Sequence, residues 1–376
     1  MSNKSDFLYY KIYSDIIARI REGSLSAGEK IEKETELAEK YSVSRATMRK
    51  ALDYLCRMNL IYRIKKGGTF INGKLNFSSQ QKIVPIVLPF TENLHRELVT
   101  GIQSTALTLN TFSPVYDSFS AYKNERDILE SIYRMGVDGL IIYPCAGINN
   151  LDWLYKFKTR GIPVVFIDRR TPGIDFPLVT SNNRQGMALA TEHLIALGHE
   201  KIAFFAMTQN MIVTEQDRLT GYLETLSNHN IPIRSEFIFS LEMLADRLVR
   251  LTPKQQTSYY NYIFKKKALK IFNPPHGQDR PTAIVFINDC LAINFMRLTA
   301  EMKDVSLPDD ISVTGFDNVA EGERSVPALT TIRQNFFRIG QKAMETMTML
   351  MQGEYVPPNN YIDTDLILRR STALRK

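Results

Sequence analysis

Cysteine is scarce in this chain: its 376 residues include three, Cys56, Cys145 and Cys290. They lie far apart in the sequence, each in an apolar context, and no two have the spacing of a metal-binding pair. We interpret them as reduced core residues of a cytoplasmic protein. We therefore expect neither a disulfide framework nor a metal site.

Long apolar runs are absent as well. No segment approaches the roughly 20 apolar residues that a membrane-spanning helix needs, and the first residues contain no apolar signal-peptide core. Hydrophobic residues nevertheless make up 44% of the chain, enough for a sizeable core. The length favours two or three domains, and we expect no membrane partner.

The common signatures of catalysis are also missing. We find no Walker loop, no Gly-x-Gly-x-x-Gly after a strand, no nucleophile elbow and no metal-ligand spacing. We therefore expect no enzyme activity, no catalytic residue and no cofactor, although doubly wound folds also occur in kinases and dehydrogenases.

Positive charge is concentrated at the N-terminus. Residues 1–75 hold 15 Lys and Arg against 9 Asp and Glu, a net charge of +6, whereas the remainder holds 32 against 31, a net charge of +1. A basic module joined to a neutral one is typical of proteins that bind a polyanion.

The basic module has the pattern of three helices and a hairpin. Apolar spacing predicts helices near 7–21, 33–40 and 44–57, the last with Met48, Ala51, Leu52 and Leu55 facing inward. Residues 60–64 and 69–71 are predicted strands around a glycine-containing turn. The tight turn between the second and third helices indicates a helix-turn-helix.

Side chains of the third helix and of the hairpin carry the chemistry of DNA binding. Arg45 and Arg49 share one helix face, and arginine can bind guanine bidentately or clamp a phosphate. A hydroxyl at a helix N-terminus suits phosphate. The alternative for any single cation is a solvated surface charge. The predicted contacts are Ser44, Arg45, Thr47, Arg49 and Lys50 on the helix and Lys65, Lys66 and Gly67 at the hairpin tip.

Over residues 5–72 the chain resembles the winged helix-turn-helix of GntR-type regulators. The resemblance is carried by segments 25–31, 36–38, 43–49 and 68–71. It implies that the third helix enters the major groove and that the hairpin, or wing, reaches the minor groove. Two positions depart from the family pattern: Thr35 replaces a common arginine, and Lys66 replaces the first glycine of the wing tip.

A polar segment over 73–82 is the expected linker. Beyond it, apolar strands alternate with helical patterns. Continuous apolar strands between helices indicate parallel sheets covered on both faces, here two doubly wound lobes. The predicted strands are 83–88, 139–143, 163–167, 201–206, 283–287 and 311–316.

Polar side chains follow several of these strands. Because ligands of open parallel sheets bind at the carboxyl ends of strands, a site is expected there. Carboxylate, amide and guanidinium groups beside aromatic rings are the chemistry of sugar binding. The candidates are Phe90, Thr91, Tyr143, Asp168, Arg169, Arg218, Asn288 and Asp317. Of Asn288 and Asp289, one is expected to bind the ligand and the other to cap a helix, and the sequence leaves open which.

Residues 83–350 resemble the effector domain of LacI/GalR regulators, which is similar to periplasmic sugar-binding proteins. The motifs are 161–168, 190–199, 218–222, 307–317 and 329–334. The resemblance implies that Asp168, Arg218, Asn288 and Asp317 contact an effector. Asn182 replaces the acid usual where the chain crosses between lobes.

The expected protein is a sugar-responsive transcriptional regulator, similar in plan to AraR-type arabinose repressors. It would consist of a DNA-binding domain (1–72), the linker (73–82) and a two-lobed domain (83–376) with crossings near 182, 333 and 346. It would repress a carbohydrate-utilisation operon, binding operator DNA as a homodimer and responding to a monosaccharide or a sugar phosphate. The alternative is a regulator whose large domain only dimerises.

Overall fold

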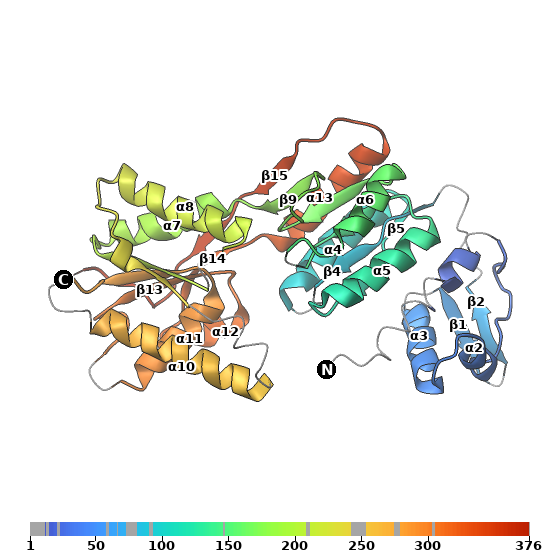
Figure 1. Cartoon of the computed structure of the whole chain (residues 1–376), viewed down its shortest axis with the longest axis horizontal. Coiled ribbons are helices and arrows are strands. Elements are labelled where there is room, and N and C mark those ends of the chain that lie inside the picture. The colour runs from blue at the N-terminus through green and yellow to red at the C-terminus, as the bar shows by residue number, and fades with distance from the viewer. Residues whose placement is uncertain are drawn as a thin grey trace. The chain divides into compact units, whose positions relative to one another are not determined.

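The computed structural model describes residues 12, 15–20, 23–57, 60–65, 67–72, 81–89, 93–145, 147–207, 211–241, 253–273, 279–302 and 305–375 (Figure 1). Three of the predicted site residues, Lys66, Phe90 and Thr91, lie outside these ranges, as does the predicted linker up to residue 80. The N-terminal domain and the two lobes are described one at a time.

The N-terminal domain is a winged helix-turn-helix. After a helical stretch at 15–20, its elements are α2 (Glu34–Lys40), α3 (Arg45–Arg57), β1 (Ile61–Ile64) and β2 (Gly68–Ile71). The strands are antiparallel, with Ile61 opposite Ile71. The expected inward stripe of α3 is confirmed, because Met48, Ala51, Leu52 and Leu55 are all at most 1% exposed.

The first lobe contains a six-stranded sheet in the order β15-β9-β8-β7-β4-β6, and its pairs from β9 to β6 are parallel. Figure 1 shows helices on both faces of the sheet. The elements of this lobe are β3 (Lys82–Ile83), β4 (Ile86–Leu88), α4 (Asn93–Thr108), β5 (Thr111–Phe112), β6 (Val115–Asp117), α5 (Tyr122–Met135), β7 (Leu140–Ile142), α6 (Leu151–Thr159), β8 (Val164–Ile167), β9 (Leu178–Ser181), α13 (Phe336–Met351) and β15 (Asn359–Ile362).

The second lobe contains a sheet in the order β11-β10-β12-β13-β14-β16, parallel except for the pair β14–β16. Helices again cover both faces. Its elements are α7 (Asn183–Ala196), β10 (Ile202–Ala206), α8 (Val213–Asn228), η1 (Ser235–Phe237), β11 (Ile238–Ser240), α10 (Pro253–Phe272), β12 (Ala283–Phe286), α11 (Asp289–Ala300), β13 (Ser312–Phe316), α12 (Ala320–Arg324), β14 (Thr330–Arg333) and β16 (Asp365–Ile367).

The chain passes between the two lobes three times. One compact unit contains residues up to Val179 and then Phe336–Asn360, and the other contains Thr180–Asn335 and Tyr361–Lys376. The first two crossings lie within about three residues of the expected positions. The third lies after residue 360 and not near 346, because α13 continues to Met351 within the first unit.

Both predicted sheets are present, and all six predicted strands occur in them. The strands that the sequence pattern did not reveal are short or lie toward the edges of the sheets, such as β6, β11 and β16. Such strands have too few residues for a periodic signal. None of the described helices is long and apolar enough to cross a membrane.

Candidate functional site

The helix-turn-helix begins its third helix with a capped N-terminus. Ser42 adopts a left-handed conformation with φ of +52° in the turn. Ser44 then accepts a hydrogen bond from the backbone N–H of Thr47 at 3.1 Å, so its hydroxyl satisfies a donor that the helix leaves open. The cap fixes the point at which α3 starts and leaves the next residues pointing outward.

Thr47 differs from its expected placement. We predicted it on an outward face, but its side chain is 3% exposed and its hydroxyl lies 2.9 Å from that of Ser44. The Thr47 side chain points inward, where it contacts the capping Ser44 on the same side of the helix as the apolar stripe at Met48 and Ala51. In the structure, Thr47 therefore supports the helix start and does not face solvent.

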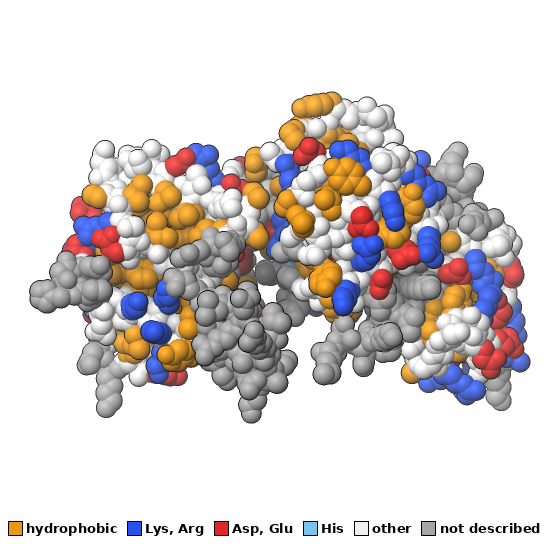
Figure 2. Space-filling model, in the orientation of Figure 1, with side chains coloured by type: hydrophobic (Ala, Val, Ile, Leu, Met, Phe, Trp, Pro, Cys, Tyr) orange, Lys and Arg blue, Asp and Glu red, His pale blue; other side chains and the backbone are white. Residues whose placement is uncertain are grey.

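Arg45, Arg49 and Lys50 are exposed on α3. Arg49 pairs with Glu34 of α2, its Nη2 lying 3.0 Å and its Nε 3.2 Å from the carboxylate Oε1. The hydrogen bonds that Arg49 donates to Glu34 raise the pKa of Arg49 above its ordinary value. Figure 2 shows Lys and Arg side chains interspersed with acidic ones over this domain.

The wing tip is a compact turn. Gly67 donates its N–H to the carbonyl oxygen of Ile64 at 2.9 Å, and a Cβ at Gly67 would lie 2.8 Å from Cγ2 of Ile64. Gly68 has a φ of +117°, a conformation that favours glycine. Lys65 is exposed beside this turn, in a position to contact a nucleic-acid backbone.

In the second lobe, Arg218 of α8 lies at the carboxyl ends of the strands. Its guanidinium is 3.7 Å from the ring centroid of Phe316, and it is 7% exposed. Nη1 donates to the carbonyl oxygen of Ile287 at 2.6 Å, and Nε donates to Oδ1 of Asn183 at 2.8 Å. Nη2 lies 3.8 Å from Oδ1 of Asp317. The guanidinium is thus held on several sides.

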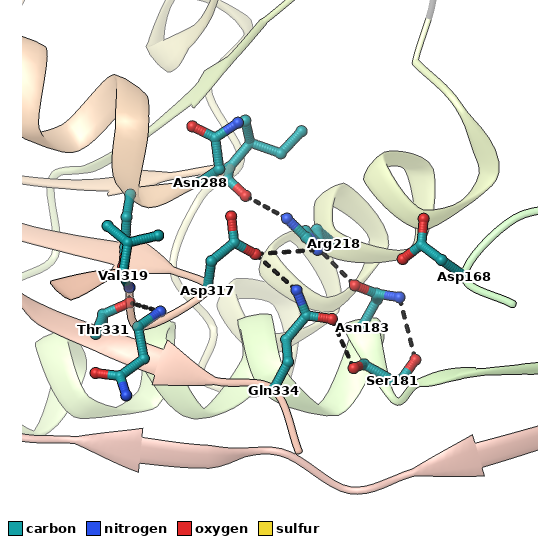
Figure 3. A network of polar contacts seen from close by, with 12 residues as sticks. Asp168, Ser181, Asn183, Arg218, Asn288, Asp317, Val319, Thr331 and Gln334 are labelled. Atoms are coloured by element: carbon teal, nitrogen blue, oxygen red, sulfur yellow. Dashed lines mark hydrogen bonds and ion pairs between the residues drawn. The ribbon is translucent and has the colours of Figure 1, made fainter. Parts of the chain in front are cut away.

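The same residues form a closed polar ring (Figure 3). Gln334 donates to Oδ1 of Asp317 at 2.6 Å and accepts from the hydroxyl of Ser181 at 2.6 Å. Asn183 donates to the carbonyl oxygen of Ser181 at 3.1 Å and accepts from Arg218, which completes the ring. Because each residue of the ring contacts two neighbours, Ser181 through its hydroxyl and its backbone carbonyl, the ring is a preorganised set of donors and acceptors.

Asn288 and Asp289 divide their roles in a way that the sequence left open. Asn288 caps α11, its Oδ1 accepting from the N–H of Leu291 at 3.0 Å. Asp289 is fully buried and accepts from Thr331 Oγ1 at 2.5 Å and from the N–H of Val319 at 2.8 Å. Burial raises the pKa of Asp289 to about 6. Both residues therefore have structural partners, and Asn288 is the more accessible of the two.

The first lobe has its own polar cluster after β8. Arg169 donates through Nη2 to the hydroxyl of Tyr143 at 2.8 Å, and its Nε lies 3.4 Å from Oδ2 of Asp168. Burial lowers the pKa of Arg169, but Tyr143 and Asp168 outweigh that effect and raise it overall. Three predicted residues, Tyr143, Asp168 and Arg169, are thus in contact. The charge of the Arg169 guanidinium is compensated by the Asp168 carboxylate.

His95 on α4 joins this cluster and was not predicted. Its ring lies 5.5 Å from that of Tyr143 and 5.8 Å from that of Phe336, and it is 3% exposed. Burial lowers the pKa of His95 to about 4, so the ring is neutral near pH 7. His95 therefore packs against the rings of Tyr143 and Phe336 at the edge of the cluster.

Backbone strain marks the two carboxylates at strand ends. Asp168 has a φ of +62° and Asp317 a φ of +119°, both in the region that favours glycine. Strained non-glycine residues persist where surrounding contacts fix them, and they cluster at binding sites. Asp168 directly follows the buried strand β8, and Asp317 directly follows the buried strand β13.

Ser181, Asn183 and Gln334 are ring members that we did not select from the sequence. All three lie in segments that carried a family resemblance, 179–183 and 329–334. A polar residue at or just after the carboxyl end of a buried strand was the available signal, because Ser181 ends β9, Asn183 follows two residues later and Gln334 directly follows β14.

Comparison with known proteins supports this architecture. Residues 8–71 match the family model of bacterial regulatory proteins of the gntR family. Residues 81–242 match the model of periplasmic binding proteins and the sugar binding domain of the LacI family, and residues 191–372 match that of a periplasmic binding protein-like domain.

Two curated relatives extend over nearly the whole chain. An arabinose metabolism transcriptional repressor of Geobacillus stearothermophilus is 28% identical, covering 99% of this chain and 99% of its own length. One from Halalkalibacterium halodurans is 25% identical, covering 94% and 91%.

Solved structures share the fold of the two lobes. The transcription regulator CcpA of Lactococcus lactis has a TM-score of 0.63 and 21% identity, covering 78% of this chain and 100% of its own. A LacI family regulator from Enterococcus faecium, with bound ribose, has a TM-score of 0.60 and 23% identity, covering 78% and 100%.

The fold and the sites define a DNA-binding transcriptional regulator with a periplasmic-binding-protein-like domain. More particularly, the chain matches the gntR family model over residues 8–71 and the LacI-family sugar binding domain model over residues 81–242, and it is similar over nearly its whole length to arabinose metabolism transcriptional repressors.

Proposed function

We propose that this protein is a sugar-responsive repressor of a carbohydrate-utilisation operon. The polar ring around Arg218 carries the proposal, because its carboxylate, amides and guanidinium offer paired donors and acceptors to sugar hydroxyls.

The charge of the two clusters favours a neutral monosaccharide over a sugar phosphate. Arg218 lies beside Asp317, and Arg169 lies beside Asp168. A phosphate group carries up to two negative charges and is favoured by cations that no carboxylate compensates. Among the described residues of both clusters, each arginine has such a carboxylate.

The effector response requires unequal binding. A sugar can change DNA binding only if it binds two states of the protein with unequal affinity and those states differ in their affinity for DNA. Asp168, Arg169 and Tyr143 are the proposed contacts of the first lobe, and Arg218, Asn288 and Asp317 those of the second. Phe90 and Thr91 remain predictions.

We propose that the operator is bound by a homodimer in the cytoplasm, where the chromosome lies. A two-fold dimer presents two recognition helices to a pseudo-palindromic site. A hollow of about 310 Å³ between α11 and α12 provides a candidate surface for the second copy. It is lined by Ile293, Met296, Arg297, Ala300, Glu321, Arg324, Ser325 and Val326. Apolar residues beside charges of both signs suit a self-complementary contact.

The experiment is a gel shift with an operator selected by the protein from random duplexes. Arabinose is the first sugar to add, followed by other pentoses and hexoses and by their phosphate esters. We expect one neutral monosaccharide to change operator affinity. If no sugar does so while the protein stays folded, the large domain only dimerises and the proposal is wrong. If phosphate esters alone act, the charge argument is wrong.

A further inference from the structure

We propose that Asp289 is a positioning residue of the effector site, because it holds the loop that presents the Asp317 carboxylate to Arg218. Asp289 is itself fully buried, so it would not touch the effector. The groups that it binds, on Thr331 and Val319, belong to the same lobe. The inference rests on the proposed sugar site and adds to it a residue that acts through another.

The loop 317–319, between β13 and α12, has an unusual backbone. Asp317 has a φ of +119° and Asn318 a φ of +55°, so two successive residues other than glycine occupy the region that favours glycine. Such conformations cost free energy and persist only where surrounding contacts fix them. The loop that carries Asp317 therefore needs partners outside itself to keep its shape.

The Asp289 carboxylate supplies these partners. Its Oδ2 accepts a hydrogen bond from the backbone N–H of Val319 at 2.8 Å, and its Oδ1 accepts one from the hydroxyl of Thr331 at 2.5 Å. The same hydroxyl oxygen accepts from the backbone N–H of Asn318 at 3.4 Å. Figure 3 shows Val319 and Thr331 on one side of Asp317 and Arg218 on the other. One carboxylate thus fixes two successive N–H groups of the loop, one directly and one through Thr331.

Gly315 gives the carboxylate room to reach the loop. Asp289 is the first residue of α11, whereas Gly315 lies on β13, two residues before Asp317. A Cβ at Gly315 would lie 2.1 Å from Oδ1 of Asp289 and 3.2 Å from its Cγ. A side chain at this point of β13 would exclude the carboxylate, so the strand and the helix are matched to each other here.

The position of the loop decides where the Asp317 carboxylate lies. Its Oδ1 accepts from Gln334 at 2.6 Å and lies 3.8 Å from Nη2 of Arg218. The Asp317 side chain is 19% exposed, so it is accessible where Asp289 is not. Binding groups need support of this kind, because a displacement of about 1 Å is enough to make a site too loose. Releasing the loop should therefore weaken sugar binding with Asp317 still present.

The protonation of Asp289 offers a second way to release the loop. Burial raises the pKa of Asp289 to about 6, although its hydrogen bonds and the positive charges that face it, on Arg369 and Arg218, oppose the rise. Arg369 also donates through Nη2 to Oδ1 of Asn318 at 2.7 Å, so it holds the loop independently of pH. Below about pH 6 the Asp289 carboxyl carries a proton and accepts hydrogen bonds less well.

The test compares Asp289→Asn with Ser312→Ala, a matched control in the same strand layer. Asparagine keeps the shape of aspartate but turns one acceptor oxygen into a donor. Ser312 is also fully buried and accepts from the backbone N–H of Ala373 at 3.0 Å, but it lies at the opposite end of β13 from Asp317. Calorimetry measures the affinity for arabinose, or for the monosaccharide that the gel shift identifies, at pH 7.5 and pH 5.5. Thermal unfolding and operator binding without sugar check that each variant is folded.

We expect Asp289→Asn to weaken sugar binding roughly three- to tenfold at pH 7.5, the range of one hydrogen bond. Ser312→Ala should bind sugar as the wild type does, although it also loses a buried hydrogen bond. In an Asp317→Ala background, Asp289→Asn should have no further effect on sugar affinity, because the two residues act as one unit. Between pH 7.5 and pH 5.5 the wild type should lose more sugar affinity than Asp289→Asn, which has no carboxyl to protonate.

Three results would overturn the inference. An equal loss of sugar affinity in Asp289→Asn and Ser312→Ala would mean that only stability matters. An undiminished effect of Asp289→Asn in the Asp317→Ala background would mean that Asp289 does not act through Asp317. Equal pH dependence in the wild type and Asp289→Asn would exclude its carboxyl as the titrating group.

Thr331→Val replaces Asp289→Asn if that variant does not fold. It removes the hydroxyl that links Asp289 to the N–H of Asn318 and keeps the shape of the side chain. Wild-type sugar affinity in Thr331→Val would then overturn the inference. If the wild-type protein binds no sugar at all, the proposed effector site fails and the inference fails with it, a result that the wild type alone distinguishes from the others.

Discussion

At the scale of single residues, the ion pair between Arg218 and Asp317 is the feature on which the proposed effector site depends. The arginine is 7% exposed and its guanidinium is held by a carbonyl oxygen, an amide and a carboxylate. A buried cation needs such compensation, because removing it from water without a partner is costly. The same arrangement leaves Arg218 aimed at the strand ends.

Asp317→Ala should weaken sugar binding by about 1.5–3 kcal/mol, the usual range of a hydrogen bond to a charged group. Operator binding in the absence of sugar should not change. Calorimetry with the active sugar measures the first quantity and a gel shift the second. Asp365→Ala is the control, because Asp365 forms an exposed pair with Arg333 at 2.8 Å. An unaltered sugar affinity in Asp317→Ala would remove this residue from the site.

His95 should make stability depend on pH. Its pKa in the folded protein is about 4, because burial disfavours the charged ring, and the unfolded value is near 6.5. As the pH falls from 6.5 towards 4, the unfolded chain binds a proton that the folded chain does not, so stability decreases. Between pH 7 and pH 5, the free energy of unfolding falls by about 2 kcal/mol because of His95 alone.

His95→Phe should therefore lose less stability than wild type between pH 7 and pH 5. Phenylalanine suits the position, since the neighbouring rings are those of Tyr143 and Phe336. Guanidinium denaturation at both pH values measures the difference. Equal losses in the two proteins would show that His95 is not the group responsible.

At the scale of elements, close packing between helices places the site. A Cβ on Gly340 of α13 would lie 2.2 Å from the carbonyl oxygen of Leu98 on α4, and one on Gly221 of α8 would lie 2.2 Å from that of Arg184 on α7. Glycine permits each pair of helices to approach closely. Because Arg218 is one turn before Gly221 on α8, the close contact between α8 and α7 also fixes the backbone position from which the Arg218 side chain extends.

The prediction at this scale concerns α3 and the contribution of its Arg45 to DNA binding. Arg45→Ala should weaken binding to the selected operator by about 1–3 kcal/mol if Arg45 contacts a base, and more uniformly across sequences if it contacts phosphate. Arg338→Ala is the control, an exposed arginine on α13 that pairs with Glu345. A gel shift with operator and scrambled duplex separates the two cases. Unchanged binding to both would exclude Arg45 from the interface.

The helices and strands also show which parts of the fold the sequence could predict. The long apolar strands and α3 were predicted because their periodicity extends over many residues and ends at recognisable caps. The edge strands β11 and β16 were not, because three residues with mixed burial carry no period. Thr47 was assigned outward because it is not part of the apolar stripe that begins at Met48, whereas its side chain is buried and its hydroxyl contacts that of Ser44.

At the scale of the whole molecule, positive charge is concentrated in the N-terminal domain, and the two lobes are nearly neutral. The basic domain carries the helix-turn-helix, and the nearly neutral remainder carries two lobes in which Arg169 and Arg218 lie beside carboxylates. Attraction to DNA is therefore confined to one end of the chain. In the proposed dimer, the response to a ligand would be transmitted to that end through the arrangement of the two chains.

Val326→Asp should reduce dimerisation if the surface between α11 and α12 joins two copies. Val326 is 89% exposed, so the substitution should not disturb folding, but it would place two carboxylates in a self-complementary contact. Val213→Asp is the control, because Val213 is also exposed, at 53%. Analytical ultracentrifugation should show monomers for the first variant and dimers for the second. Dimers in both would place the interface elsewhere.

The sequence by itself determined the order of parts: a basic helix-turn-helix, then parallel strands with polar residues at their ends. Local periodicity, capping residues and charge are encoded by neighbours in the chain, so they can be interpreted without the fold. The tertiary structure decided the partners, such as Gln334 with Asp317, Asp289 with Thr331 and Glu34 with Arg49. Such contacts join residues 15 to 42 positions apart, and only the packing of helices and strands brings them within hydrogen-bonding distance.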